Sequence, residues 1–106
     1  MTGDKDRRPQ ALSAVLSQKN IEITGTLVFE DESIIYPAVK SVSMRGAQRE
    51  ITGMLVANGY VAAGRWTEEG DDEDGFLEFS RTFKPGPGAT VFPVEFAGGP
   101  LPQRMD

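Results

Sequence analysis

The dipeptide Asn58-Gly59 constrains the fold of this chain more than any other feature of its sequence. Asparagine and glycine both tolerate the positive φ angles of a two-residue hairpin turn, and the pair stands between two runs rich in strand-forming residues. We therefore predict a β-hairpin over residues 51–67, closed by Ala57 and Tyr60. Because opposed residues of antiparallel strands share a face, the turn also fixes which side chains lie together.

One face of the predicted hairpin carries isoleucine, leucine and tryptophan and is expected to face the core. The opposite face is more apolar than a sheet surface in water requires. It is formed by Met54, Val56, Val61 and Ala63. We predict that these four residues form an interface with a partner protein or with a second copy of the chain. Burial beneath the N-terminal segment is an equally favoured alternative.

The whole chain is read as three parts. Residues 1–20 are predicted to be a flexible N-terminal arm, and residues 97–106 a disordered tail rich in glycine and proline. Residues 21–96 form the β-domain between them. Within the arm, a short helix is predicted over residues 10–17, because three apolar residues recur there at helical spacing, namely Leu12, Val15 and Leu16.

Alternating apolar residues predict six strands, at residues 21–29, 34–44, 51–57, 60–67, 76–83 and 90–96. The links between them are short. The predicted fold is therefore all-β, a six-stranded antiparallel meander that forms a small barrel or a two-layer sandwich. Pro37 and Pro93 each lack a backbone donor, so their strands are expected at an edge or a bulge.

The composition narrows the possible functions. The chain has no cysteine and no histidine, which removes the thiol nucleophile, the thiolate metal site and the commonest general base, so we predict no enzyme activity, no cofactor and no metal site. The formal net charge is -5, which disfavours nucleic acid as a partner. No run of about 20 apolar residues is present, so no membrane segment is expected, and we predict a cytoplasmic protein.

The predicted pairing of the strands at residues 60–67 and 76–83 places a candidate ligand site on the core side of the sheet. If Arg65 opposes Glu78, then Arg81 falls on the same face as Trp66 and Tyr60. A guanidinium on a core face is costly unless it is paired or stacked. We predict that Arg81, Trp66 and Tyr60 either form a mouth for a small anionic ligand or stack on one another as part of the structure.

Six of the eight residues from Glu68 to Gly75 are acidic, which raises the possibility of a calcium site. The EF-hand spacing fails, however. With Gly75 at its sixth position, the first and twelfth positions would be Gly70 and Arg81, and neither side chain supplies a carboxylate. A solvated charged loop is the preferred interpretation.

Two short patterns resemble known families. The run Gly64-Arg65-Trp66, followed by residues 75–81, resembles the glycine, tryptophan and arginine pattern of calycin-type barrels, which implies an apolar cavity for a small ligand. Arg7-Arg8, followed by Ser41-x-Ser43-x-x-Gly46, resembles the two PilZ signatures that clamp cyclic di-GMP on a six-stranded barrel. Ala11 stands where the second PilZ arginine is expected, and Ser41 stands where an acid or amide is expected.

The sequence thus leaves two functions open. The first is a small non-enzymatic β module that binds a protein partner or itself through Met54, Val56, Val61 and Ala63. The alternative is a small-ligand carrier or sensor that uses Arg81, Trp66 and Tyr60, with either a calycin-like pocket or a degenerate PilZ-like barrel.

Overall fold

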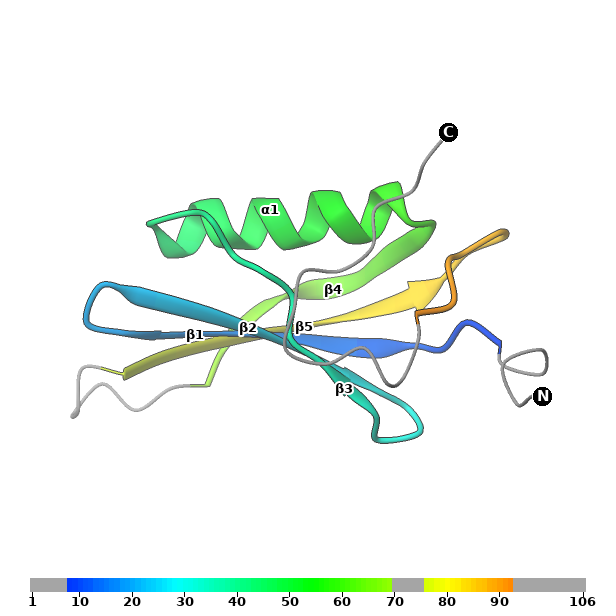
Figure 1. Ribbon diagram of the computed structural model, residues 1–106, viewed down its shortest axis with the longest axis horizontal. Coiled ribbons are helices and arrows are strands. Elements are labelled where there is room, and N and C mark those ends of the chain that lie inside the picture. The colour runs from blue at the N-terminus through cyan, green and yellow to red at the C-terminus, as the bar shows by residue number, and fades with distance from the viewer. Residues whose placement is uncertain (1–7, 70–75, 93–106) are drawn as a thin grey trace.

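The computed structural model describes residues 8–69 and 76–92, in which one α-helix lies across one face of an antiparallel sheet (Figure 1). Five strands form this sheet in the order β3-β2-β1-β5-β4. The elements are β1 (Leu12–Lys19), β2 (Glu22–Phe29), β3 (Ile34–Ile35), α1 (Met44–Ala57), β4 (Tyr60–Glu68) and β5 (Phe76–Pro85). The predicted antiparallel and mostly β fold is confirmed, but the described residues contain five strands rather than six.

β1 lies at the centre of the sheet, in the place of the predicted N-terminal helix, so that prediction is wrong. The apolar residues fit helical spacing, but Leu12, Ala14 and Leu16 also alternate, and these are the three that the strand buries. Asn20, with φ of +58°, turns the chain tightly into β2. Residues 12–19 therefore belong to the sheet and not to a flexible arm.

β2 confirms the strand predicted over residues 21–29, whereas the strand predicted over residues 34–44 is reduced to the two residues of β3. The chain then leaves the sheet and crosses β2 at Gly25. A Cβ atom at Gly25 would lie only 3.1 Å from a methyl carbon of Val39 and 3.3 Å from the ring of Pro37. The missing side chain at this glycine lets the connecting segment pack directly on the strand.

The predicted hairpin over residues 51–67 is wrong, because its first half is the C-terminal part of α1. Three residues spaced by four, Ala47, Ile51 and Leu55, form the buried face of this helix. Ser43 caps its N-terminus, since the side-chain oxygen accepts a hydrogen bond from the Gly46 N–H. Asn58-Gly59 ends the helix instead of turning a hairpin, and the Asn58 N–H donates to the carbonyl oxygens of Met54 and Leu55.

β4 and β5 pair two residues away from the predicted register, with Ala62 opposite Phe83 rather than Arg81. A shift of two residues leaves every side chain on its predicted face. The pairing is interrupted by a β-bulge, in which the three residues Gly64, Arg65 and Trp66 of β4 span the single residue Arg81 of β5. Gly64 has φ of +85°, a conformation that favours glycine.

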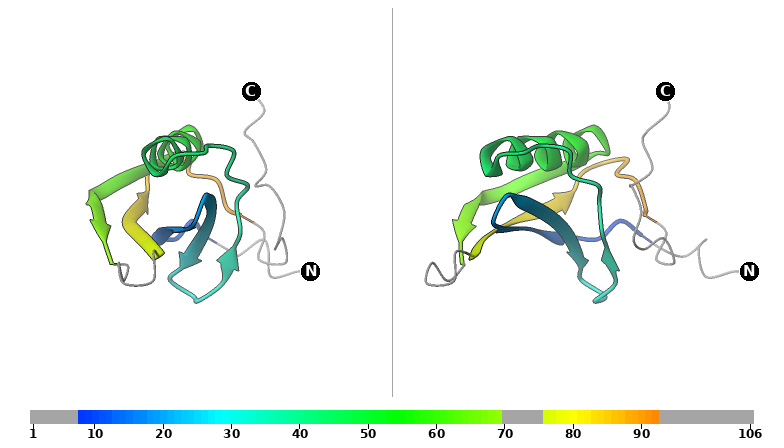
Figure 2. Two further views of the ribbon diagram at one scale, coloured as in Figure 1. Left: turned by 90° about the vertical axis from the view of Figure 1, so that its left-hand side faces the viewer. Right: turned by 60° about the vertical axis from the view of Figure 1, so that its left-hand side comes forward.

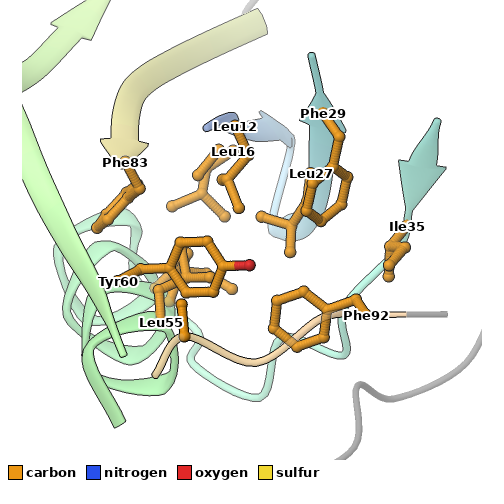
Figure 3. Close-up of a cluster of buried hydrophobic side chains, with 13 residues drawn as sticks. Leu12, Leu16, Leu27, Phe29, Ile35, Leu55, Tyr60, Phe83 and Phe92 are labelled. Carbon is orange, nitrogen blue, oxygen red and sulfur yellow. The ribbon is translucent and has the colours of Figure 1, made fainter. Parts of the chain in front are cut away.

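α1 lies over one face of the sheet (Figure 2), and the buried side chains of the core lie between the two layers (Figure 3). Phe92 closes one end of the core, with ring centroids 5.8 Å from Tyr60 and 6.0 Å from Phe29. Residues 90–92 form no strand, and residues 93–96 of the predicted sixth strand and the 97–106 tail lie outside the described residues. β3 and β4 remain the two edges, so the sheet does not close into the barrel that both family resemblances imply.

Candidate functional site

A pocket of about 440 Å³ opens between the N-terminal part of α1 and the bulge of β4 and β5. Its volume lies within the range usual for small-molecule sites. Three of its side chains are guanidinium groups, and the others are polar, small or aromatic. The lining residues are Arg45, Gln48, Arg49, Thr52, Gly53, Trp66 and Arg81.

α1 contributes a polar stripe beside its buried face. Arg45, Arg49 and Thr52 are separated by four and three residues, so they lie on one side of the helix. The Ser43 cap and the buried face of α1 together fix the rotation of the helix about its axis. That rotation places the stripe toward the pocket.

Glu50 holds the start of α1 against the segment that precedes it. Its carboxylate accepts hydrogen bonds from the Lys40 N–H at 3.0 and 3.1 Å, the Ser41 N–H at 3.0 Å and the Ser41 hydroxyl at 2.9 Å. Partial burial acts to raise the pKa of Glu50, but these hydrogen bonds outweigh it and hold the pKa below its ordinary value. These hydrogen bonds from the connecting segment thus favour the ionised form of Glu50.

The β-bulge brings Arg81 into the pocket. Arg81 is paired with Ala14 on β1, so it lies on the core side of the sheet. Its Nε donates to the carbonyl oxygen of Gly64 at 2.9 Å, and its guanidinium carbon lies 5.7 Å from the centroid of Phe83. The side chain is therefore held at its base by one hydrogen bond and one cation–π contact.

Trp66 forms part of the pocket wall at the end of the same bulge. Its ring is half-buried and meets Phe83 in an edge-to-face contact, with centroids 6.4 Å apart. Aromatic pairs of this geometry stabilise the fold by about 0.5–1.5 kcal/mol beyond the area that they bury. The indole is thus fixed by the core while it lines the pocket.

The charge of the pocket is positive. Among residues 8–69 and 76–92, no carboxylate forms an ion pair with Arg45, Arg49 or Arg81. Each guanidinium group carries one positive charge, so the pocket wall holds three like charges. Mutual repulsion disfavours this arrangement, and an anion placed between the groups would relieve it.

The structure brings together two of the three predicted ligand residues. Arg81 and Trp66 line the same pocket, whereas Tyr60 does not. Tyr60 is only 2% exposed and lies among the buried side chains of the core (Figure 3). Its hydroxyl group donates a hydrogen bond to the Thr90 carbonyl oxygen at 2.6 Å. Sequence reasoning missed the helical residues of the pocket, although the spacing of Arg45 and Arg49 is the signal that could have found them.

The four predicted interface residues lie on two different elements. Met54 and Val56 belong to α1, and Val61 and Ala63 belong to β4. Met54 packs against the core, while Val56 and Val61 are 54% and 60% exposed. A stable protein interface buries about 800 Å² on each partner, far more than two valines offer. Binding of a partner through these residues stays a prediction.

Three further predictions concern parts of the chain outside the pocket. Residues 70–75 of the acidic loop lie outside the described residues, and within the described ranges no cluster of three potential metal ligands is found. The Ser41 and Ser43 positions of the PilZ-like pattern serve the helix instead, since Ser43 caps α1 and Ser41 binds Glu50. Over the described part of the chain, no helix has the length and apolar character to cross a membrane.

Comparison with known proteins gives no relative, because no family model, no curated protein and no solved structure matches this chain.

Proposed function

We propose that this protein is a small non-enzymatic binding module that holds a small organic anion in the pocket between α1 and the β-bulge. The observation that carries the proposal is that Arg45, Arg49 and Arg81 line one pocket together with Trp66, without an ion pair to any described carboxylate. Arginines at a concave site recognise carboxylate and phosphate groups through two parallel hydrogen bonds.

The location of the pocket supports the same conclusion. Arg81 and Trp66 come from the sheet, and both are fixed by contacts with Phe83. Arg45 and Arg49 come from a helix whose start is held by Glu50. Because Arg81 and Trp66 are held by these contacts before a ligand arrives, they lose little conformational freedom when it binds, which favours affinity.

The side chains of the pocket also explain why binding is proposed without catalysis. They are three guanidinium groups, one amide, one hydroxyl, one glycine and one indole. They include no imidazole, carboxyl or thiol group, the groups that most often serve in general acid–base chemistry. The pocket can hold an anion but offers no proton-transferring group to act on it.

The test is a titration of Trp66 fluorescence with sodium pyrophosphate at low, constant ionic strength. Trp66 is the only tryptophan of the chain, so its emission reports on the pocket alone. The wild-type protein is expected to show a saturable change in emission. The double variant Arg45→Gln with Arg49→Gln should lose most of it, because two of the three positive charges are removed while both sites are exposed.

The matched control is Arg65→Gln, which removes an exposed arginine that does not line the pocket. This variant should bind as the wild type does. Equal binding by the wild type and the double variant would show that the anion binds elsewhere. The absence of any saturable change in the wild type up to millimolar pyrophosphate would refute the proposed function.

A further inference from the structure

The charge of the pocket favours a ligand with more than one negative charge. A monoanion would leave two of the three guanidinium groups uncompensated, whereas a phosphate monoester carries close to two negative charges at neutral pH and offers three acceptor oxygens. Arg45 and Arg49 are one helical turn apart, so both can contact one tetrahedral group. Arg81 reaches the same pocket from the sheet.

The uncharged part of the pocket favours a flat ring. Trp66 lines it with a half-buried indole, a surface on which aromatic rings stack regardless of their substituents. Gly53 lines it from the interior of α1, and no atom lies within 4 Å of the position that its Cβ would occupy. A glycine inside a helix lowers the stability of the fold. The presence of Gly53 beside this open space therefore favours a site at which a ligand occupies the space.

We infer that the pocket takes a small molecule that combines an aromatic ring with a phosphate monoester. The phosphate lies between the arginines, and the ring stacks on Trp66. This inference rests on the proposed function and narrows it from organic anions in general to one chemical class. A nucleoside monophosphate and a simple aryl phosphate share this chemistry.

Calorimetric titration with three probes at about pH 7.5 separates the two requirements, because a phosphate monoester is doubly ionised there. Phenyl phosphate is the full ligand, phenyl sulfate keeps the ring but carries one charge, and methyl phosphate keeps the charge but lacks the ring. Phenyl phosphate should bind at least about tenfold more tightly than either of the others, since each missing interaction costs roughly that factor.

A variant of Trp66 tests whether this residue is the source of the preference for the aromatic ring. Trp66→Leu should bind methyl phosphate as the wild type does but lose the tenfold preference for phenyl phosphate. Tyr36→Leu is the matched control, because Tyr36 is an exposed aromatic residue that does not line the pocket, and this variant should keep the preference. Circular dichroism checks that each variant is folded.

The failures of the two proposals are distinguishable. Equal affinities for phenyl phosphate, phenyl sulfate and methyl phosphate would overturn the aryl phosphate inference while leaving anion binding intact. A preference for phenyl phosphate that survives Trp66→Leu would also overturn it. If none of the probes binds, the proposed function fails as well. Where phenyl phosphate binds, a titration with adenosine 5′-monophosphate separates nucleoside monophosphates from simple aryl phosphates. Tighter binding than that of phenyl phosphate assigns the nucleoside class, and weaker binding assigns the simple aryl class.

Discussion

Gly59 decides how α1 passes into β4. It has φ of +91°, and a Cβ atom at this position would lie 2.7 Å from the Cα of Ala89. Its carbonyl oxygen also accepts a hydrogen bond from the Gly86 N–H at 2.8 Å. The sequence identified this glycine correctly as a residue that needs positive φ, but the same property serves a helix end as well as a hairpin turn.

Two glycine-to-alanine variants should therefore have opposite effects on stability. Gly59→Ala should destabilise the protein by about 2 kcal/mol or more, because the left-handed conformation alone costs an L residue roughly 1–2 kcal/mol and the added methyl group also meets backbone. Gly53→Ala should stabilise it by about 0.5–1 kcal/mol, since alanine is favoured inside a helix and the site is open. Urea denaturation measures both, and a stabilising Gly59→Ala would contradict the described helix end.

Arg81 could be located from the sequence alone, whereas Arg45 and Arg49 could not. The predicted register of β4 and β5 differs from the observed one by two residues, and an even shift preserves the face of every side chain. The predicted face of Arg81 and Trp66 is therefore the observed one, although the predicted pairing is wrong. Arg45 and Arg49 fall between the strands predicted over residues 34–44 and 51–57, so the prediction places no helix there.

α1 is the element for which the sequence pattern gives the least accurate prediction. Its last residues include β-branched and apolar side chains that alternate locally, which favours a strand when residues 51–56 are read alone. The burial of Ala47, Ile51 and Leu55 follows a spacing of four that becomes visible only over the full length of the helix. Contacts with the sheet stabilise the helix where local propensity favours a strand.

The connection between Glu50 and the preceding segment makes the stability of α1 depend on pH. A carboxyl group whose pKa is lower in the folded than in the unfolded chain stabilises the fold at pH values above its unfolded pKa. That contribution is lost as the pH falls through the folded pKa. The hydrogen bonds to Lys40 and Ser41, which hold the pKa of Glu50 down, are the source of this dependence.

Glu50→Gln should accordingly be less stable than the wild type at neutral pH. The difference should shrink as the pH falls through and below the ordinary pKa range of a glutamate, because the wild type then loses the same charge. Thermal unfolding followed by circular dichroism across this pH range measures the difference. Glu32→Gln removes one negative charge at an exposed position and is the control measured in parallel. A Glu50→Gln difference that stays constant with pH would contradict the account.

At the scale of the whole molecule, the pairing of β1 with β5 organises both the sheet and the pocket. It joins segments far apart in the chain, as in the contact between the Ser17 hydroxyl and a Glu78 carboxylate oxygen, 61 residues apart. Local patterns predicted β2, β5 and most of β4, but they carry no information on which distant strands become neighbours. They predicted a meander, and a meander has no helix above the sheet and hence no pocket between the two layers.

The central claim is that anions bind between α1 and the β-bulge, and nuclear magnetic resonance tests it most directly. Backbone amide signals of the whole chain are followed during a titration with sodium pyrophosphate. The account predicts that the largest changes occur at residues 45–53, 64–66 and 81. Changes concentrated instead at basic residues outside the pocket, such as Arg8, Lys19 and Lys84, would contradict it.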